Sequence, residues 1–166
     1  MTLYFEDIAV GHCFPELIKG PMTTSHIMRW SAAMENWHRI HYDWRFATQH
    51  DGLPDVLVNG SWKQHVLVQL LKDSLGTGGW LWKLKFRYRA MDVAGDTMFT
   101  RASITRTEAI DGLGFVEMNI EMRNQRDIVS TTGAAIGVLP LRGGARVPYP
   151  FAPTPAQQAL TLPADS

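Results

Sequence analysis

The feature that most constrains the fold is a change of hydrophobic period near residue 80. Before it, between Asn59 and Gly76, apolar residues recur at helical spacing and cover a broad part of the helix circumference. After it, from Trp80 to Arg89, apolar residues alternate with basic ones, which is the period of a strand. We therefore predict one largely buried helix followed by an antiparallel meander, an α+β arrangement.

Individual positions give this prediction its detail. The apolar positions of the helix are Trp62, Val66, Leu67, Leu70, Leu71 and Leu75. In the strand that follows, we expect Trp80, Trp82, Leu84, Phe86 and Tyr88 on one face, and Lys83, Lys85, Arg87 and Arg89 on the other. Three more strands are predicted at about 98–106, 116–123 and 128–139, with a turn at Asp111-Gly112 between the first two.

Shorter elements are predicted before the long helix. Two short strands flank a turn at Gly11, and the second runs from Phe14 to Ile18. A threonine or serine at positions 23–25 caps a helix that ends near Asn36. Asp43 caps a further short helix over 44–49.

The two parts of the chain differ in composition at about residue 140. The tail beyond it contains Gly-Gly, several prolines and many alanines, so we predict irregular structure that lies on the surface. We therefore divide the chain into a domain at 1–140 and a Pro/Ala-rich tail at 141–166.

Length, charge and cysteine content narrow the class of protein. The 166 residues fit one domain. Sixteen basic and sixteen acidic residues balance, which excludes the basic excess that nucleic-acid or anionic-membrane binding needs. No apolar stretch approaches the roughly 18 residues of a membrane-spanning helix. Cys13 is the single cysteine, so an internal disulfide is impossible, and we expect a small buried side chain in a cytoplasmic protein.

The segment from Asn36 to Asp43, Asn-Trp-His-Arg-Ile-His-Tyr-Asp, concentrates polar and ionisable groups between two predicted helices. A loop held by flanking helices is a suitable place for catalytic groups, and a histidine exchanges protons near neutral pH. A solvated polar connection is the alternative reading. Metal binding by His38 and His41 would need a second cluster of ligands, which the sequence does not provide, so we expect no metal.

This segment resembles the hydratase motif of MaoC-like proteins. His41 aligns with the catalytic histidine, Ile40 with the apolar residue before it and Asp43 with the aspartate after it, and Ala47 matches a small residue one turn later. The form found here is similar to a branch that contains 3-hydroxyacyl-thioester dehydratases of mitochondrial type and mesaconyl-CoA hydratases. Val58-Asn59-Gly60 stands where the family has His-Gly, and the run from Phe86 to Asp96 resembles a Phe-Arg…Gly-Asp signature.

The resemblance covers about residues 3–140 and implies a hot-dog fold, in which a curved antiparallel sheet wraps around one long helix. It also implies a homodimer or higher homo-oligomer, and an acyl thioester of coenzyme A or of an acyl carrier as the substrate. The carrier would be part of the substrate, so no separate cofactor is expected.

Asn36 is a departure from the family pattern, which has a catalytic aspartate at this position. An amide orients water by hydrogen bonds but is a poor proton acceptor. Three readings follow: His41 is the sole base while Asn36 holds the water, Glu35 supplies the carboxylate, or the hydration chemistry is lost. We favour the first, because the related branch also has asparagine there.

Gly60 is the candidate for stabilising the enolate-like oxygen of a thioester. A backbone N–H at a helix N-terminus carries a free donor and the positive end of the helix dipole, and a residue without a side chain lets the carbonyl approach. The alternative is that Gly60 only permits a tight turn into the helix. Asn59 either orients this loop or lines the substrate pocket.

Three further residues are candidates for contact with the substrate. Trp37 flanks the motif and is placed to shape an acyl pocket, although most tryptophans of such a chain belong to the core. Arg87 and Arg89 lie on the polar face of their strand, where they would meet coenzyme A phosphates or simply be solvated.

We therefore predict a hydratase or dehydratase that acts on an enoyl or 3-hydroxyacyl thioester. His41 would transfer the proton, Asn36 would hold the water, Gly60 would polarise the carbonyl and Asp43 would support the loop. Two alternatives stand beside it. One is an acyl-CoA thioesterase on the same fold, for which Glu35 would matter more. The other is a non-catalytic acyl-thioester-binding subunit, which the missing aspartate suggests.

Overall fold

The apolar run after Asn59 forms helix α2 (Gly60–Leu75) in the computed structural model, which describes residues 2–163. Gly76 ends the helix with a φ of 68°, a left-handed conformation that glycine adopts without a steric cost. The apolar side chains that the helix buries are Val66, Leu67, Leu70, Leu71 and Leu75. Burial of each contributes about 1.5–3 kcal/mol, so this stripe fixes the helix against the sheet.

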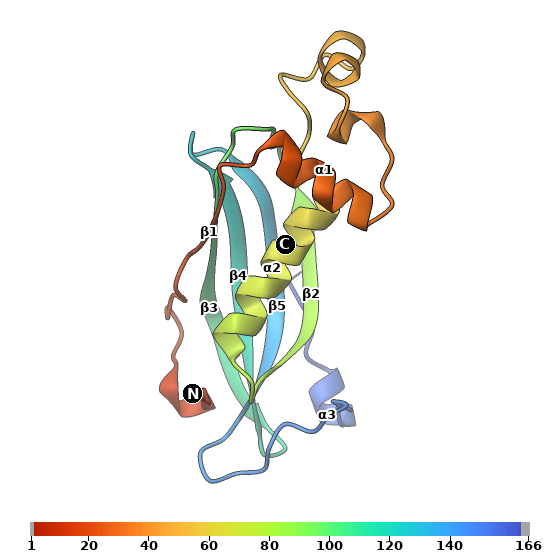
Figure 1. Ribbon diagram of the computed structural model, residues 1–166. Coiled ribbons are helices and arrows are strands. Elements are labelled where there is room, and N and C mark those ends of the chain that lie inside the picture. Colours follow the sequence, from red (N-terminus) through yellow and green to blue (C-terminus); the bar gives the residue numbers. More distant parts are fainter. Residues whose placement is uncertain (1, 164–166) are drawn as a thin grey trace.

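The sheet that receives α2 has five strands: β1 (Leu17–Lys19), β2 (Trp80–Tyr88), β3 (Met98–Ile110), β4 (Leu113–Asn124) and β5 (Val129–Pro140). Their order is β1-β3-β4-β5-β2, and every neighbouring pair is antiparallel. The sheet curves around α2, which crosses it diagonally (Figure 1). The predicted arrangement of a curved sheet around one long central helix is confirmed.

Strand β2 departs from the predicted alternation. Its pairing with β5 shifts register between Leu81 and Lys83, so Trp82 forms a bulge. Trp80 and Trp82 consequently pack on the outer side of the sheet with Phe115, whereas Leu84 and Phe86 pack in the core under α2 with Leu81. The prediction of one continuous apolar face from Trp80 to Tyr88 is therefore wrong, because one inserted residue moves the side chains that precede it to the opposite face.

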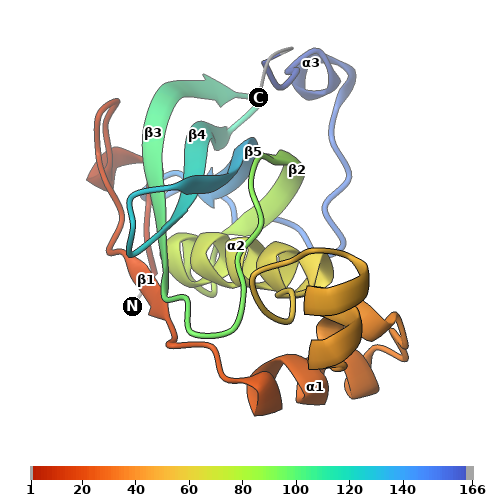
Figure 2. The same cartoon turned by 90° about the horizontal axis from the view of Figure 1, so that it is seen from above.

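The C-terminal tail covers the outer side of the sheet. Its short helix α3 (Pro155–Gln158) and α2 lie on opposite sides of the sheet, as Figure 2 shows from above. The tail residues that pack on the outer apolar cluster are Val147, Phe151, Leu160 and Leu162. Apart from α3, residues 141–163 of the tail are irregular, and residues 164–166 lie outside the described part.

A cap at one end of the sheet consists of helix α1 (Thr24–Ala33), the 3-10 turn η2 (Arg39–His41) and the π-helical turn η3 (Phe46–His50) (Figure 1). The 3-10 turn η1 (Phe5–Asp7) lies at the other end, beside the start of β4. The expected first strand is wrong, since η1 stands in its place, and Cys13 is exposed where we expected burial. None of the helices formed by residues 2–163 has the length and apolar character to cross a membrane.

Helix α1 begins as the sequence predicts and ends slightly earlier. Thr23 is its N-cap: the hydroxyl accepts from the N–H of His26, and His26 Nδ1 accepts from the N–H of Thr23. The helix ends at Ala33, and Glu35 adopts a φ of 51°. This left-handed residue turns the chain away from the helix axis before Asn36.

Candidate active site

His41 lies at the end of η2, against the segment that leads into α2. The N–H of Leu57 donates to the carbonyl of Ile40 at 2.8 Å, and His41 Nδ1 lies 2.8 Å from the carbonyl of Leu57. On its other side, this segment pairs with Val93 in an isolated β-bridge. His41 is thus held by a segment that ends three residues later at Gly60, the first residue of the helix.

The bond to Leu57 determines which ring nitrogen of His41 is free. A carbonyl oxygen only accepts, so Nδ1 must carry the proton, and Nε2 of the neutral ring has the lone pair. The residue is 6% exposed, and burial lowers its pKa below the ordinary 6.5; the bond to Leu57 opposes this shift and the nearby His38 adds to it. His41 is therefore neutral at pH 7 with Nε2 available as a base.

The N-terminus of α2 is left without a side-chain cap. Asn59 occupies the N-cap position, yet its buried amide bonds to the hydroxyl of Ser31 on α1 rather than to the first turn. The Asn59 carbonyl accepts from the N–H groups of Trp62 and Lys63. Within residues 2–163, the N–H groups of Gly60 and Ser61 have no acceptor. Two free donors at the positive end of the helix dipole can bind a developing oxyanion.

Gly60 also has a packing reason to lack a side chain. The Tyr88 hydroxyl donates to the carbonyl of Gly60 at 2.6 Å, and a Cβ added at Gly60 would lie 2.9 Å from the ring atom Cζ of Tyr88. Burial raises the pKa of the Tyr88 hydroxyl, which stays protonated as a donor. Close packing under Tyr88 therefore requires glycine here, in addition to any need for room at its N–H.

A buried ion pair lies one turn into α2. Lys63 Nζ is 2.6 Å from Asp92 Oδ2 and donates to the carbonyl of Ala90 at 3.0 Å, while Asp92 Oδ1 accepts from Asn124. The Lys63 side chain is 3% exposed and that of Asp92 is fully buried. These contacts tie the first turn of α2 to the loop after β2.

Sequence reasoning missed Ser31, Lys63 and Tyr88. Two of them were detectable, because each is a polar residue on an apolar helical stripe: Ser31 lies four positions after buried Ile27, and Lys63 lies three and four positions before Val66 and Leu67. Tyr88 gave no such signal, because its contact with Gly60 joins elements that are far apart in the chain.

Asn36 and Glu35 follow α1, and only Asn36 is bonded toward the site. The N–H of Asn36 donates to the carbonyl of Ser31 at 2.9 Å, and its side-chain oxygen accepts from the N–H of His38 at 3.3 Å. Ser31 thus connects Asn36 to Asn59 and the start of α2. Glu35 is exposed in its left-handed turn. Its carboxylate has no hydrogen-bond or ion-pair partner within the described part of the chain.

Asp43 holds the end of the motif. One of its carboxylate oxygens accepts from the N–H of Phe46, which is the predicted cap, and the other binds Arg39 through two nitrogens at 3.1 and 2.7 Å. The bonds from Phe46 and then Arg39 lower the pKa of Asp43, so it is ionised at neutral pH. The Arg39 guanidinium lies 4.4 Å above the Phe46 ring centre, which packs the two turns together.

The three candidates for substrate contact form no hydrogen bond with His41, Asn36, Asn59 or Gly60 within residues 2–163. Trp37 is 58% exposed, with its ring edge-on to Tyr42. Arg87 and Arg89 are both exposed, and side chains one residue apart in a strand point to opposite faces, so Arg87 points away from the face on which Tyr88 meets Gly60. Arg89 Nε donates to the hydroxyl of Thr132 at 2.9 Å.

The structure therefore links His41 and Asn36 to the uncapped start of α2, His41 through Leu57 and Asn36 through Ser31 and Asn59. It does not bring Glu35, Arg87 or Arg89 into contact with them. The arrangement has a neutral base and two free N–H donors, which suits proton transfer next to a carbonyl that becomes negatively charged.

The chain is similar to known proteins in part of its sequence and in its fold. The family model for hydroxyacyl-thioester dehydratase type 2 matches residues 16–96, which include the motif, the start of α2 and β2. No curated protein sequence matches the chain significantly.

Solved structures with the same fold are numerous but distant in sequence. The MaoC-like dehydratase from Rhodospirillum rubrum has a TM-score of 0.74 at 19% identity, over 84% of this chain and 98% of its own. The (R)-hydratase from A. caviae, involved in PHA biosynthesis, has a TM-score of 0.72 at 19% identity, over 81% and 99%. The ChsH1–ChsH2 complex from Mycobacterium tuberculosis contains a chain with a TM-score of 0.66 at 22% identity, over 81% and 98%.

These likenesses establish the hot-dog fold. Together with the family model, which matches the segment that contains His41 and the start of α2, they support the resemblance to MaoC-like proteins.

Proposed function

We propose that the chain is a hydratase or dehydratase that adds water to an enoyl thioester or removes it from a 3-hydroxyacyl thioester, with coenzyme A as the carrier. The observation that carries this proposal is the state of His41. Its ring is buried and neutral, its tautomer is fixed by Leu57, its Nε2 is free, and Leu57 belongs to the segment that runs directly into the uncapped start of α2.

In the hydration direction, the thioester oxygen binds the N–H groups of Gly60 and Ser61. His41 Nε2 takes a proton from water as the water oxygen bonds to the β-carbon, and the carbon–carbon π electrons move toward the thioester oxygen as an enolate. The imidazolium then returns its proton to the α-carbon, so one water has been added. Dehydration is the reverse. The reaction uses only groups of the chain, and the carrier is part of the substrate.

Because the chain has Asn36 in place of an aspartate, the proposed reaction has a single base, His41. Its side-chain oxygen already accepts from the N–H of His38, and its NH₂ group donates, so Asn36 can hold a water oxygen but cannot take a proton. His41 must therefore both accept and return the proton. Asp43 takes no part in proton transfer, because its carboxylate is committed to Phe46 and Arg39.

The test is the loss of enoyl absorbance when the purified protein is mixed with crotonyl-CoA and with longer or branched enoyl-CoAs. His41→Ala should lower kcat/KM by about 10²–10⁴-fold, which is the usual contribution of a general base. His12→Ala is the matched control, because His12 is exposed and contacts only Phe14 among aromatic rings. Hydration that survives in His41→Ala would refute the assignment of the base.

Two other outcomes correspond to the alternative functions. Release of free CoA would indicate a thioesterase, and silence across the panel would indicate a binding subunit. Two variants, Glu35→Gln and Asn36→Ala, test which of these side chains acts on the water. Loss of one neutral hydrogen bond to water should reduce the Asn36→Ala rate by about 3- to 10-fold, whereas Glu35→Gln should change nothing. A larger loss in Glu35→Gln would instead favour the carboxylate.

We also infer that two copies of the chain associate through β2. This strand stands at the edge of the sheet next to β5 alone, so its other edge is unpaired within residues 2–163. It has nine residues, which is long for a free edge, and a second copy could continue the sheet there. Sedimentation equilibrium should give the mass of a dimer, and a monomer at all concentrations would contradict the inference.

A further inference from the structure

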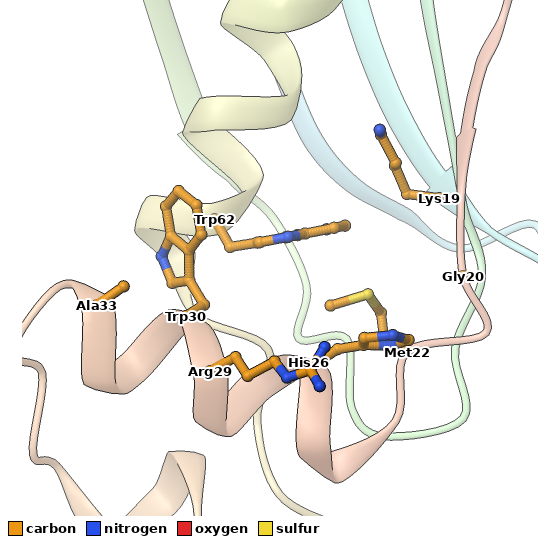
Figure 3. Close-up of a pocket in the computed structure, with 8 residues that line it drawn as sticks. All are labelled: Lys19, Gly20, Met22, His26, Arg29, Trp30, Ala33 and Trp62. Atoms are coloured by element: carbon orange, nitrogen blue, oxygen red, sulfur yellow. The ribbon is translucent and has the colours of Figure 1, made fainter.

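A cavity of about 380 Å³ lies beside the start of α2, in the range that small ligands occupy. It is lined by the chain from Lys19 to Met22, by one face of α1 and by the first turn of α2. Figure 3 shows the indoles of Trp30 and Trp62 on one side and Lys19 across from them. His41 is not among its lining residues, so the cavity adjoins the candidate active site without being the place where His41 acts.

The charged lining of this cavity is entirely basic. Lys19 and Arg29 contribute to it, the imidazole of His26 lies beside them, and no aspartate or glutamate lines the cavity. Within residues 2–163, Lys19 and Arg29 form no ion pair, unlike Arg39, Arg101, Arg123, Arg126 and Arg142 elsewhere on the surface. His26 Nδ1 is used by the cap of α1, which leaves Nε2 free. The cavity therefore presents apolar walls with two cations that form no ion pair, and suits a slender uncharged chain that ends in an anion.

A hydrogen bond links this cavity to the proposed oxyanion donors. Trp30 Nε1 donates to the hydroxyl of Ser61 at 2.9 Å, and Ser61 is one of the two residues whose N–H is free. A thioester held there has its acyl carbons toward His41, because His41 must act on them. Its sulfur therefore points away from His41, and the cavity walled by Trp30 and Trp62 is the space available on that side.

We propose that this cavity binds the phosphopantetheine arm of the substrate, with the arm packed on the two indoles and its phosphate bound by Lys19 and Arg29. The assignment rests on the proposed function. The arm is shared by coenzyme A and acyl carrier protein, so the cavity would serve either carrier. Arg87 and Arg89, which we predicted as phosphate contacts, would then be left to the more distant phosphates of coenzyme A or to solvent.

The test compares three crotonyl thioesters: that of CoA, that of acyl carrier protein and that of pantetheine, which has no phosphate. In Lys19→Ala/Arg29→Ala, kcat/KM should fall at least about tenfold for the first two, as expected for lost charge-assisted hydrogen bonds. For the pantetheine thioester it should stay within twofold. Lys72→Ala/Arg146→Ala removes the same charge from exposed sites elsewhere and should leave all three unchanged.

Equal loss for all three thioesters, or no loss, would overturn the proposal. Loss confined to the CoA thioester would also overturn it, because the cations would then bind the nucleotide and not the arm. A binding measurement separates failure of this proposal from failure of the proposed function. Free 4′-phosphopantetheine should quench tryptophan fluorescence in the wild-type protein and in His41→Ala, and the quenching should be smaller in Trp62→Phe. In Lys19→Ala/Arg29→Ala, the affinity for 4′-phosphopantetheine should be at least tenfold lower. Absence of quenching in the wild-type protein would overturn the assignment even if hydration is observed.

Discussion

The two ends of α2 bury opposite kinds of side chain. Toward its C-terminus, Leu70, Leu71 and Leu75 pack into the apolar core against the sheet. In its first turn the buried side chain is a charged one, Lys63, and the residue before the helix is the buried amide Asn59. The same helix is therefore held by many interchangeable apolar contacts at one end and by a few specific polar bonds at the other.

This difference separates stability from position. Apolar contacts lack direction, so the leucine end can fix the helix to the sheet without setting the place of its first N–H groups. At the polar end, each group has a defined partner from a remote element: Asn59 has Ser31, Lys63 has Asp92, and Tyr88 reaches the carbonyl of Gly60. We infer that the leucine end provides most of the folding free energy, while the polar end sets the geometry of the candidate active site.

The largest expected effect comes from breaking the buried ion pair. Lys63→Met leaves Asp92 buried without its partner, and removal of one member of such a pair costs about 3–5 kcal/mol. Adding Asp92→Asn removes the stranded charge and keeps an acceptor for Asn124, so the double variant should recover much of the loss. Urea unfolding measures both. Lys72→Met, an exposed control on the same helix, should stay within about 0.5 kcal/mol. If Lys63→Met alone is as stable as the wild-type protein, the ion pair does not have this role.

The leucine end should respond in stability alone. Leu75→Ala removes the two Cδ atoms that pack closely against Gly137, leaves a cavity there and should cost about 2–5 kcal/mol. Since Leu75 is at the far end of the helix from Gly60, kcat/KM of the folded variant should match that of the wild-type protein in the crotonyl-CoA assay. A tenfold loss of kcat/KM in fully folded protein would show that the two ends are not separable.

The smallest expected effect tests the contact between Gly60 and Tyr88. In the wild-type background, Gly60→Ala brings a methyl group within 2.9 Å of the Tyr88 ring and should destabilise the protein by about 1–3 kcal/mol. With Tyr88→Ala, the methyl group has room, and the better helix propensity of alanine should make the same change neutral or stabilising. Thermal unfolding of the four combinations gives the comparison. If Gly60→Ala destabilises the protein equally in both backgrounds, the added methyl group does not clash with Tyr88.

Periodicity predicted the fold wherever one pattern runs unbroken, and failed where a single residue interrupts it. The run from Trp62 to Leu75 has one period throughout, and the helix appears with its predicted ends at Asn59 and Gly76. In β2 the bulge at Trp82 leaves no mark in an alternating sequence, because the register is set by pairing with β5 and not by the strand itself.

The candidate site follows the same rule. His41 and Gly60 could be chosen from the sequence, because a local motif and a helix start mark them. The tautomer of His41 could not, since it depends on a carbonyl sixteen residues away, and the diversion of Asn59 from capping depends on Ser31, twenty-eight residues away. Contacts of this kind exist only after the chain has folded.

The measurement that tests the central claim most directly is the pH dependence of kcat/KM for crotonyl-CoA. His41 acts as a base only when it is neutral, and burial lowers its pKa below 6.5, so activity should be constant above pH 7 and fall as the pH decreases through a midpoint below 6.5. The residual activity of His41→Gln should lack this acid limb. A midpoint above 6.5, or an acid limb that persists unchanged in His41→Gln, would show that another group carries the proton.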